Sequence, residues 1–91
     1  MRYIVFDGTK MTSKELAHQH MKEALHAKDY YGANLDALHD VLTEISTDTM
    51  ITFKHIEAAR ENLQDYFDAI DMVCKDSAEE NDNLSIQMEL Q

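Results

Sequence analysis

Two aspartates that lie four residues apart, Asp36 and Asp40, are the side chains of this sequence with the clearest potential for chemistry. They follow two adjacent tyrosines and a glycine in the stretch DYYGANLDALHDVL, which begins at Asp29. Paired carboxylates can serve as an acid and a base when an enclosed pocket keeps one of them protonated. Helical spacing instead places both on the open, polar face of one helix, so we do not expect an acid–base pair here.

The histidines and the cysteine do not combine into a catalytic or metal site. His18 and His20 lie two positions apart and project from different sides of a helix, and His26 lies eight positions after His18. The sequence contains no pair of cysteines, no HExxH motif and no EF-hand loop, and its two glycines cannot form a glycine-rich phosphate loop. Cys74 stands beside Val73 in a segment that is expected to be buried, where cysteine acts as a small hydrophobic residue. We therefore expect these histidines at the solvated surface, no metal or cofactor, and no enzymatic activity.

The charge of the chain is strongly negative and unevenly distributed. The 91 residues carry a formal net charge of −10; residues 1–28 hold five basic against three acidic side chains, and residues 29–91 hold three basic against fifteen acidic ones. An acidic surface repels phosphates, so we do not expect direct binding to nucleic acid, whereas a basic protein would be attracted. The simpler alternative is that the excess charge only keeps the protein soluble.

Composition also limits the class and location of the protein. The hydrophobic content of 44% is typical of a globular chain, and 91 residues are enough for one domain, 1–91, with one core. No apolar run approaches the roughly 20 residues that cross a bilayer, and the first residues, MRYIVFDG, lack the pattern of a secretory signal. A lone cysteine is typical of a reducing compartment. We expect a cytoplasmic protein with no membrane partner.

Hydrophobic periodicity predicts three strands that are separated by pairs of helices. β-Branched and aromatic residues predict a strand at 2–6, the segment TMITF is expected to form a second strand at 49–53, and alternation predicts a third at 84–90. Helical spacing predicts helices at 13–27, from 35 onward and at 56–77, with a break in the last near 62–65 and a polar connection over 76–83. Thr12 and Glu15 fit a capping box at the first helix, and Asn34 is the expected N-cap of the second.

These elements imply a fold, because strands that are joined through helices are normally parallel, with right-handed connections. The predicted fold class is α/β: a three-stranded parallel sheet packed with about four helices, in the order β-αα-β-αα-β, with strand 49–53 in the centre. The core candidates on the helices are Ala17, Met21, Ala24, Leu25, Leu38, Val41, Leu42, Ile45, Ile56, Ala59, Leu63, Phe67, Ile70 and Val73. The opposite face of the helix that starts at 35 is polar and holds Asp36, His39, Asp40, Thr43 and Glu44.

The adjacent tyrosines, Tyr30 and Tyr31, allow two interpretations. They can pack on the core as part of a turn at Gly32, ahead of an ordinary solvated helix. Exposed tyrosines beside polar groups are also typical of protein-binding surfaces, because they supply rigid contact area and a hydroxyl group. The residues themselves leave both interpretations open.

The stretch YYGANLDALHDVL, residues 30–42, resembles the barstar family of intracellular ribonuclease inhibitors. Its pattern YYG-x-NLDAL-x-D-x-L is long and specific, and the chain length, the acidity and the closing segment LSIQMEL agree with the family over nearly all 91 residues. The resemblance implies a three-stranded parallel sheet with helices. It also implies inhibition of a basic ribonuclease, of the extracellular or toxin type, whose cationic active site is occupied so that RNA is excluded. The alternative is an acidic interaction module for a basic partner that is not a nuclease.

The resemblance further implies a set of partner-binding residues. Asp40 corresponds to a central aspartate of the family, which takes the place of a substrate phosphate, and Asp36 corresponds to a second acid at the contact. The departures are His39, where a well-known member has tryptophan, Glu44, which replaces a glycine, and Ile45, which replaces an aromatic residue. The complete set of expected contact residues is Tyr30, Tyr31, Gly32, Asn34, Leu35, Asp36, His39, Asp40, Thr43, Glu44, Asp76 and Glu80.

Overall fold

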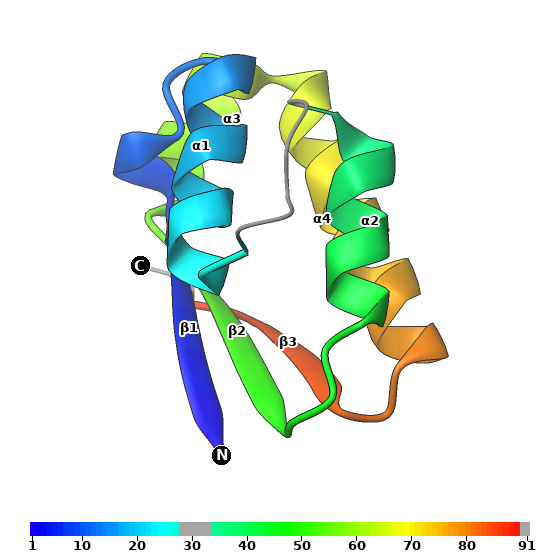
Figure 1. Cartoon of the computed structure of the whole chain (residues 1–91). Coiled ribbons are helices and arrows are strands. Elements are labelled where there is room, and N and C mark those ends of the chain that lie inside the picture. Colours follow the sequence, from blue (N-terminus) through cyan, green and yellow to red (C-terminus); the bar gives the residue numbers. More distant parts are fainter. Residues whose placement is uncertain (28–33, 90–91) are drawn as a thin grey trace.

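The computed structural model describes residues 1–27 and 34–89, and three parallel strands form the sheet of this described part (Figure 1). Strand β1 spans Arg2–Asp7, β2 spans Thr49–Lys54 and β3 spans Leu84–Met88. Their spatial order is β1-β2-β3, and the first residues of the three strands are paired with one another. The predicted fold class, the parallel sheet and the central place of the second strand are confirmed.

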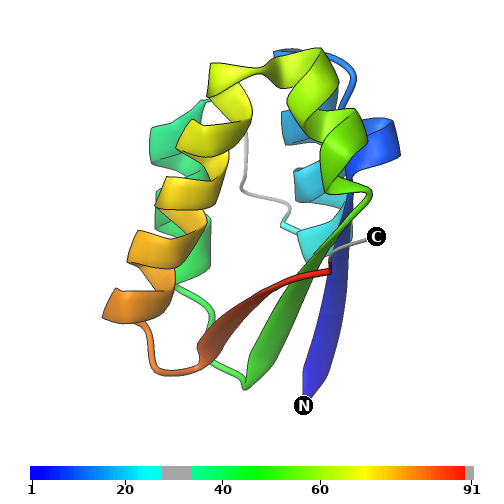
Figure 2. The ribbon, with the colours of Figure 1, turned by 180° about the vertical axis from the view of Figure 1, so that it is seen from behind.

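Pairs of helices connect the strands. Helices α1 (Lys14–Leu25) and α2 (Leu35–Thr43) lie between β1 and β2, α3 (Ile56–Leu63) and α4 (Asp65–Glu80) lie between β2 and β3, and a short 3-10 turn, η1 (Gly8–Lys10), follows β1. Figures 1 and 2 show α2 beside α4, on the side of the molecule away from α1. The order β-αα-β-αα-β is confirmed, as is the break within 56–77, because Gln64, with a φ of 52°, separates α3 from α4. Within the described residues, no helix combines the length and the apolar character that crossing a membrane requires.

An apolar core lies between one face of the sheet and the helices. Phe6 of β1 is fully buried, whereas Tyr3 and Val5, on the other face of the same strand, are exposed. The rings of Phe6, Phe53 and Phe67 meet edge to face, with centroid distances of 5.3 and 5.8 Å. This arrangement is favoured by the quadrupoles of the rings and joins β1, β2 and α4 at the centre of the core.

Most of the core residues that were predicted on the helices are buried. The buried ones are Ala17, Met21, Leu25, Leu38, Leu42, Ile56, Ala59, Leu63, Phe67 and Ile70, and the half-buried ones are Ala24, Val41, Ile45 and Val73. On α4, Cys74 is fully buried in place of Val73. The buried stripe of α4 runs through positions 67, 70, 74 and 77 at the helical spacings of three and four, and Val73 stands at its side.

Both ends of α1 differ from the prediction. Ser13, and not Thr12, is the N-cap, and its Oγ accepts a hydrogen bond of 3.2 Å from the backbone N–H three residues later. The fully buried Met11 anchors the preceding chain in the core, which leaves Thr12 exposed in the connection. Helix α1 then ends at Leu25, because His26 takes the left-handed conformation with a φ of 53°.

Helix α4 is longer than predicted and replaces the first part of the polar connection that was expected over 76–83. It continues to Glu80, so that Asp76 also lies on the helix. Ser77 is fully buried, and its hydroxyl donates a hydrogen bond of 2.8 Å to the carbonyl of Val73. This local bond satisfies the buried hydroxyl without solvent.

The prediction of solvated histidines is wrong for two residues of α1. His18 is 2% exposed, and its Nε2 lies 2.6 Å from Oη of Tyr66. His20 is half-buried, and its Nε2 accepts a hydrogen bond of 2.8 Å from the backbone N–H of Asp7. His26 is exposed, as expected. The partners of the two enclosed histidines lie on other elements, so the local spacing could not indicate them.

Candidate protein-binding surface

Helix α2 is amphipathic and has a defined start. Asn34 is its N-cap, as predicted, and the side-chain Oδ1 accepts a hydrogen bond of 2.7 Å from the backbone N–H three residues later. Leu38 and Leu42 are fully buried, whereas Asp36 and Asp40 are exposed on the opposite face. The packing of the leucines on the core therefore determines which face of α2 carries the two carboxylates.

The end of α2 is held by Asn81, a residue that the sequence patterns did not single out. Its buried Nδ2 donates hydrogen bonds to the carbonyls of Leu42, at 3.0 Å, and Ile45, at 2.9 Å. Its Oδ1 accepts a bond of 3.0 Å from the backbone N–H of Asn83. One amide thus ties α2 to the connection that enters β3. The run Asn-Asp-Asn directly after a helix is the signal that could have indicated it, because such side chains often bond nearby backbone groups.

Helix α4 joins the surface of α2 through a side-chain contact. Nε2 of His39 lies 2.7 Å from Oε2 of Glu80, and the side chains are 37% and 60% exposed. Asp76, also exposed, lies one turn before Glu80 on the same helix. A hydrated pair of this kind adds at most about 1 kcal/mol of stability. It does bring together two segments that are 41 residues apart in the sequence.

The carboxylates of α2 are not neutralised by other side chains in the described part of the chain. Across residues 1–27 and 34–89, Asp36, Asp40 and Glu44 form no ion pair, and α2 contains no lysine or arginine. Asp40 and Glu44 also lie near the C-terminal end of α2, where the helix dipole disfavours negative charge. Local arrangements that cost stability are common at binding sites. Within the described residues, the exposed face of α2 therefore carries negative charge that no ion pair compensates.

The predicted contact residues fall into three groups. Asn34, Leu35, Asp36, His39, Asp40, Thr43 and Glu44 lie on α2 or at its ends, Asp76 and Glu80 lie on α4, and Tyr30, Tyr31 and Gly32 lie outside the described residues. Some of them have a structural task as well: Thr43 Oγ1 donates a hydrogen bond of 2.9 Å to the carbonyl of His39, and Leu35 packs against the core. Their contact with a partner stays a prediction.

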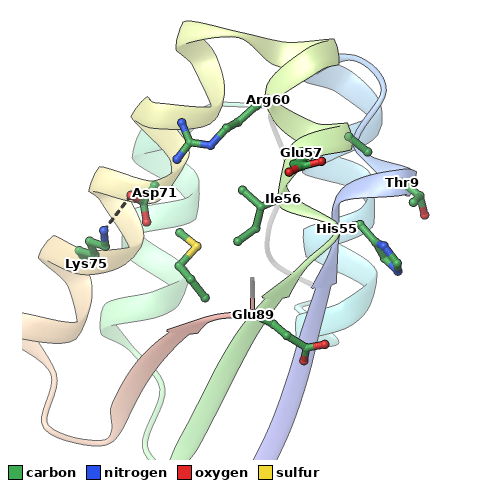
Figure 3. Close-up of a pocket in the computed structure, with 10 residues that line it drawn as sticks. Thr9, His55, Ile56, Glu57, Arg60, Asp71, Lys75 and Glu89 are labelled. Carbon is green, nitrogen blue, oxygen red and sulfur yellow. Dashed lines mark hydrogen bonds and ion pairs between the residues drawn. The ribbon is translucent and has the colours of Figure 1, made fainter. Parts of the chain in front are cut away.

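A separate cavity of about 560 Å³ lies between the start of α3, α4 and the end of β3 (Figure 3). Its lysine and its arginine are paired within the chain: Lys75 lies 2.9 Å from Asp71, and Arg60 lies 3.1 Å from Asp68. No residue of α2 lines this cavity. The portion of the chain that the structure describes holds no group of three or more His, Cys, Asp or Glu side chains that could bind a metal ion. This cavity is therefore separate from the carboxylates of α2, and its two strongly basic residues are already paired.

The fold and this surface define a class of protein, namely a small acidic α/β protein whose exposed side chains are suited to binding. Residues 1–91 match the family described as Barstar (barnase inhibitor), and the chain belongs to this family. Over 81 residues it is 36% identical to a protein of Bacillus subtilis (strain 168) named "Putative ribonuclease inhibitor YrdF", and the alignment covers 88% of this chain and 89% of that protein. The resemblance of residues 30–42 to the family is thereby confirmed. Family and relative indicate an inhibitor and not an enzyme, which confirms that expectation too.

Proposed function

We propose that this protein inhibits a basic ribonuclease by placing the acidic face of α2 in the cationic active site of the enzyme, so that RNA is excluded. The observation that carries the proposal is the pair Asp36 and Asp40, exposed one turn apart and without an ion pair in the described residues. Carboxylates at this spacing can occupy positions that RNA phosphates would otherwise take. The family and the name of the Bacillus subtilis relative support a ribonuclease as the target.

Charge complementarity explains both the attraction of the enzyme and the rejection of RNA. The net charge of −10 attracts a basic enzyme, of the extracellular or toxin type, and raises the rate of association. The same charge repels RNA, so the protein competes for the enzyme and does not bind the substrate. The complex forms in the cytoplasm, where an unpaired, buried cysteine such as Cys74 stays reduced.

Asp40 is the central contact of this proposal, with Asp36 and Glu80 beside it and the tyrosines at 30–31 completing the surface. In a complex its carboxylate loses water and accepts charge-assisted hydrogen bonds from arginine, which are about twice as strong as neutral ones. In the free protein it is exposed, so its removal costs little stability. Replacement of Asp40 therefore separates binding from folding.

The test compares Asp40→Ala with Glu61→Ala. Glu61 is an exposed acid on α3 with no ion pair in the described residues, so its replacement changes the net charge equally at a distance from α2. The immobilised protein captures its partner from extracts of the source organism, and inhibition of the captured enzyme is measured with a fluorogenic RNA. We expect Glu61→Ala to inhibit like the wild type and Asp40→Ala to bind at least about 30-fold more weakly, which is about 2 kcal/mol. This expected loss of affinity is carried over from the barstar family, in which an aspartate of the inhibitor is a known binding hot spot.

Two outcomes would contradict the proposal in different ways. Equal inhibition by Asp40→Ala and the wild type would show that α2 is not the inhibitory surface. A captured partner that is basic but has no ribonuclease activity would favour the acidic interaction module instead. Thermal unfolding of both variants within about 0.5 kcal/mol of the wild type is the control for folding.

A further inference from the structure

Helix α1 is attached to β1 by a hydrogen bond that requires a neutral histidine. The backbone N–H of Asp7 donates to Nε2 of His20, with a distance of 2.8 Å between the two nitrogens. A backbone amide can only donate, so Nε2 must be free of a proton, and neutral His20 carries its proton on Nδ1. The geometry alone thus determines the charge state and the tautomer of this side chain.

The same helix has a second attachment to β1 that does not depend on protons. Nη2 of Arg2 donates a hydrogen bond of 2.6 Å to the carbonyl of Leu25, at the C-terminal end of α1. Arginine stays charged at every pH at which proteins fold. Acid can therefore release α1 at the Asp7 contact while the Arg2 contact persists.

The surroundings of His20 oppose its protonation in the folded protein. Its ring lies edge-on to Phe6, with centroids 6.4 Å apart. Burial lowers the pKa of His20 below its ordinary value of 6.5, and Lys10 of η1 lowers it further, against the opposite effects of Asp7 on β1 and Glu23 on α1 itself. His55, which follows β2, also faces Asp7.

His18 gives α1 a further contact, with α4, and a hydroxyl can form this contact with a neutral or a protonated imidazole. It is 2% exposed, its Nε2 lies 2.6 Å from Oη of Tyr66, and burial lowers its pKa below the ordinary value of 6.5. Lys14, on α1, lies over the ring of Tyr66 at 4.8 Å from its centroid and adds positive charge to this contact. A charged imidazole here would be desolvated beside another cation.

We propose that α1 is a proton-operated element of this fold: its docking on β1 requires neutral His20, so that mild acid favours release of α1 from β1 while the sheet and the α2–α4 pair stay folded. The imidazole of His20 binds a proton more readily once α1 is released, because burial and Lys10 no longer oppose its charge. Docking is therefore fully stable above about pH 6.5 and weakens as the pH falls below it. Below about pH 6.5, the population of the opened form rises by up to about tenfold per pH unit, because His20 is protonated only when α1 is released.

The test is amide hydrogen exchange, followed by NMR on the whole protein between about pH 7.5 and pH 5, with the intrinsic pH dependence of exchange removed. In the wild type we expect the protection of the Asp7 amide and of the α1 amides to fall several-fold, by about fivefold at most, between about pH 6.5 and 5.5, while the amides of β2 and α4 keep theirs. His20→Gln supplies an oxygen that can accept from Asp7 at any pH, so this variant should lose most of the pH dependence. His26→Asn replaces the exposed histidine at the C-cap of α1, where asparagine also tolerates the left-handed conformation, and should behave like the wild type.

Three results would overturn the proposal. Protection of α1 that is constant from about pH 7.5 to pH 5 would show that docking does not depend on protons. If His20→Gln keeps the pH dependence of the wild type, His20 is not the group that controls the docking of α1. If the amides of β2 lose protection in parallel with those of α1, the acid causes global unfolding and not release of α1. If His20→Gln does not fold, the nitrogen resonances of His20 in the wild type decide the question: a protonated Nε2 while α1 remains docked would contradict the assignment.

Discussion

Replacement of Asn81 by alanine removes a buried amide that bonds both the end of α2 and the connection into β3. Three of its hydrogen bonds are short, at 2.9, 3.0 and 3.0 Å, and they reach the carbonyls of Ile45 and Leu42 and the N–H of Asn83. Each of these hydrogen bonds contributes about 1 kcal/mol to the free energy of unfolding, so the loss of all three lowers it by about 3 kcal/mol. Because water can replace some of the lost bonds where the partners are only part-buried, we expect a value within about 2–4 kcal/mol. For a domain of this size, about 3 kcal/mol lowers the melting temperature by roughly 12–24 °C.

Urea unfolding followed by far-UV circular dichroism measures this change, and an unchanged slope shows that the unfolded state is the same. Asn83→Ala is the matched control, because its side chain makes only a long contact of 3.4 Å with the carbonyl of Ile45 and should cost less than about 1 kcal/mol. Asn81→Asp keeps the acceptor for the N–H of Asn83 but turns an oxygen toward carbonyl oxygens, so it should be at least as destabilising near pH 7. Equal stabilities of Asn81→Ala and Asn83→Ala would refute the conclusion that this amide holds α2 in place.

Three further predictions concern separate features of the molecule. Association with a basic ribonuclease, measured by stopped flow, should slow sharply from 0.01 M to 1 M salt, because the Debye length falls from about 30 Å to about 3 Å; unchanged rates would argue against electrostatic steering. Cys74 is fully buried, and burial together with Asp71 raises its pKa to about 12, so a chromogenic thiol reagent should react only as fast as the protein opens; rapid reaction with the native protein would contradict this. Gly8→Ala would place a Cβ against the carbonyl oxygen of His55 and should cost about 1–3 kcal/mol in urea unfolding, whereas exposed Lys10→Ala should change stability little.

Local patterns in the sequence were enough to predict the elements and the face of α2 that meets solvent. The alternation of strand residues and the helical spacing of Leu38 and Leu42 indicate which side of each element is buried. The buried side in turn determines how each element is oriented in the fold. The absence of basic residues around Asp36 and Asp40 was also visible, because a charge without sequence neighbours of opposite sign is a local property. The pattern of residues 30–42 added the family, which the comparison confirmed.

Contacts between elements could be decided only by the tertiary structure. His20 bonds Asp7 across 13 residues, and Asn81 bonds the end of α2 across 36 to 39 residues, so neither partner lies within the few positions that periodicity samples. The pairing of His39 with Glu80 depended in addition on the unexpected length of α4, which continues to Glu80. A sequence pattern indicates which face of an element is apolar. Which polar side chains form hydrogen bonds between two elements depends on the packing angle and the register of those elements. The packing angle and the register are set only when the whole chain is folded.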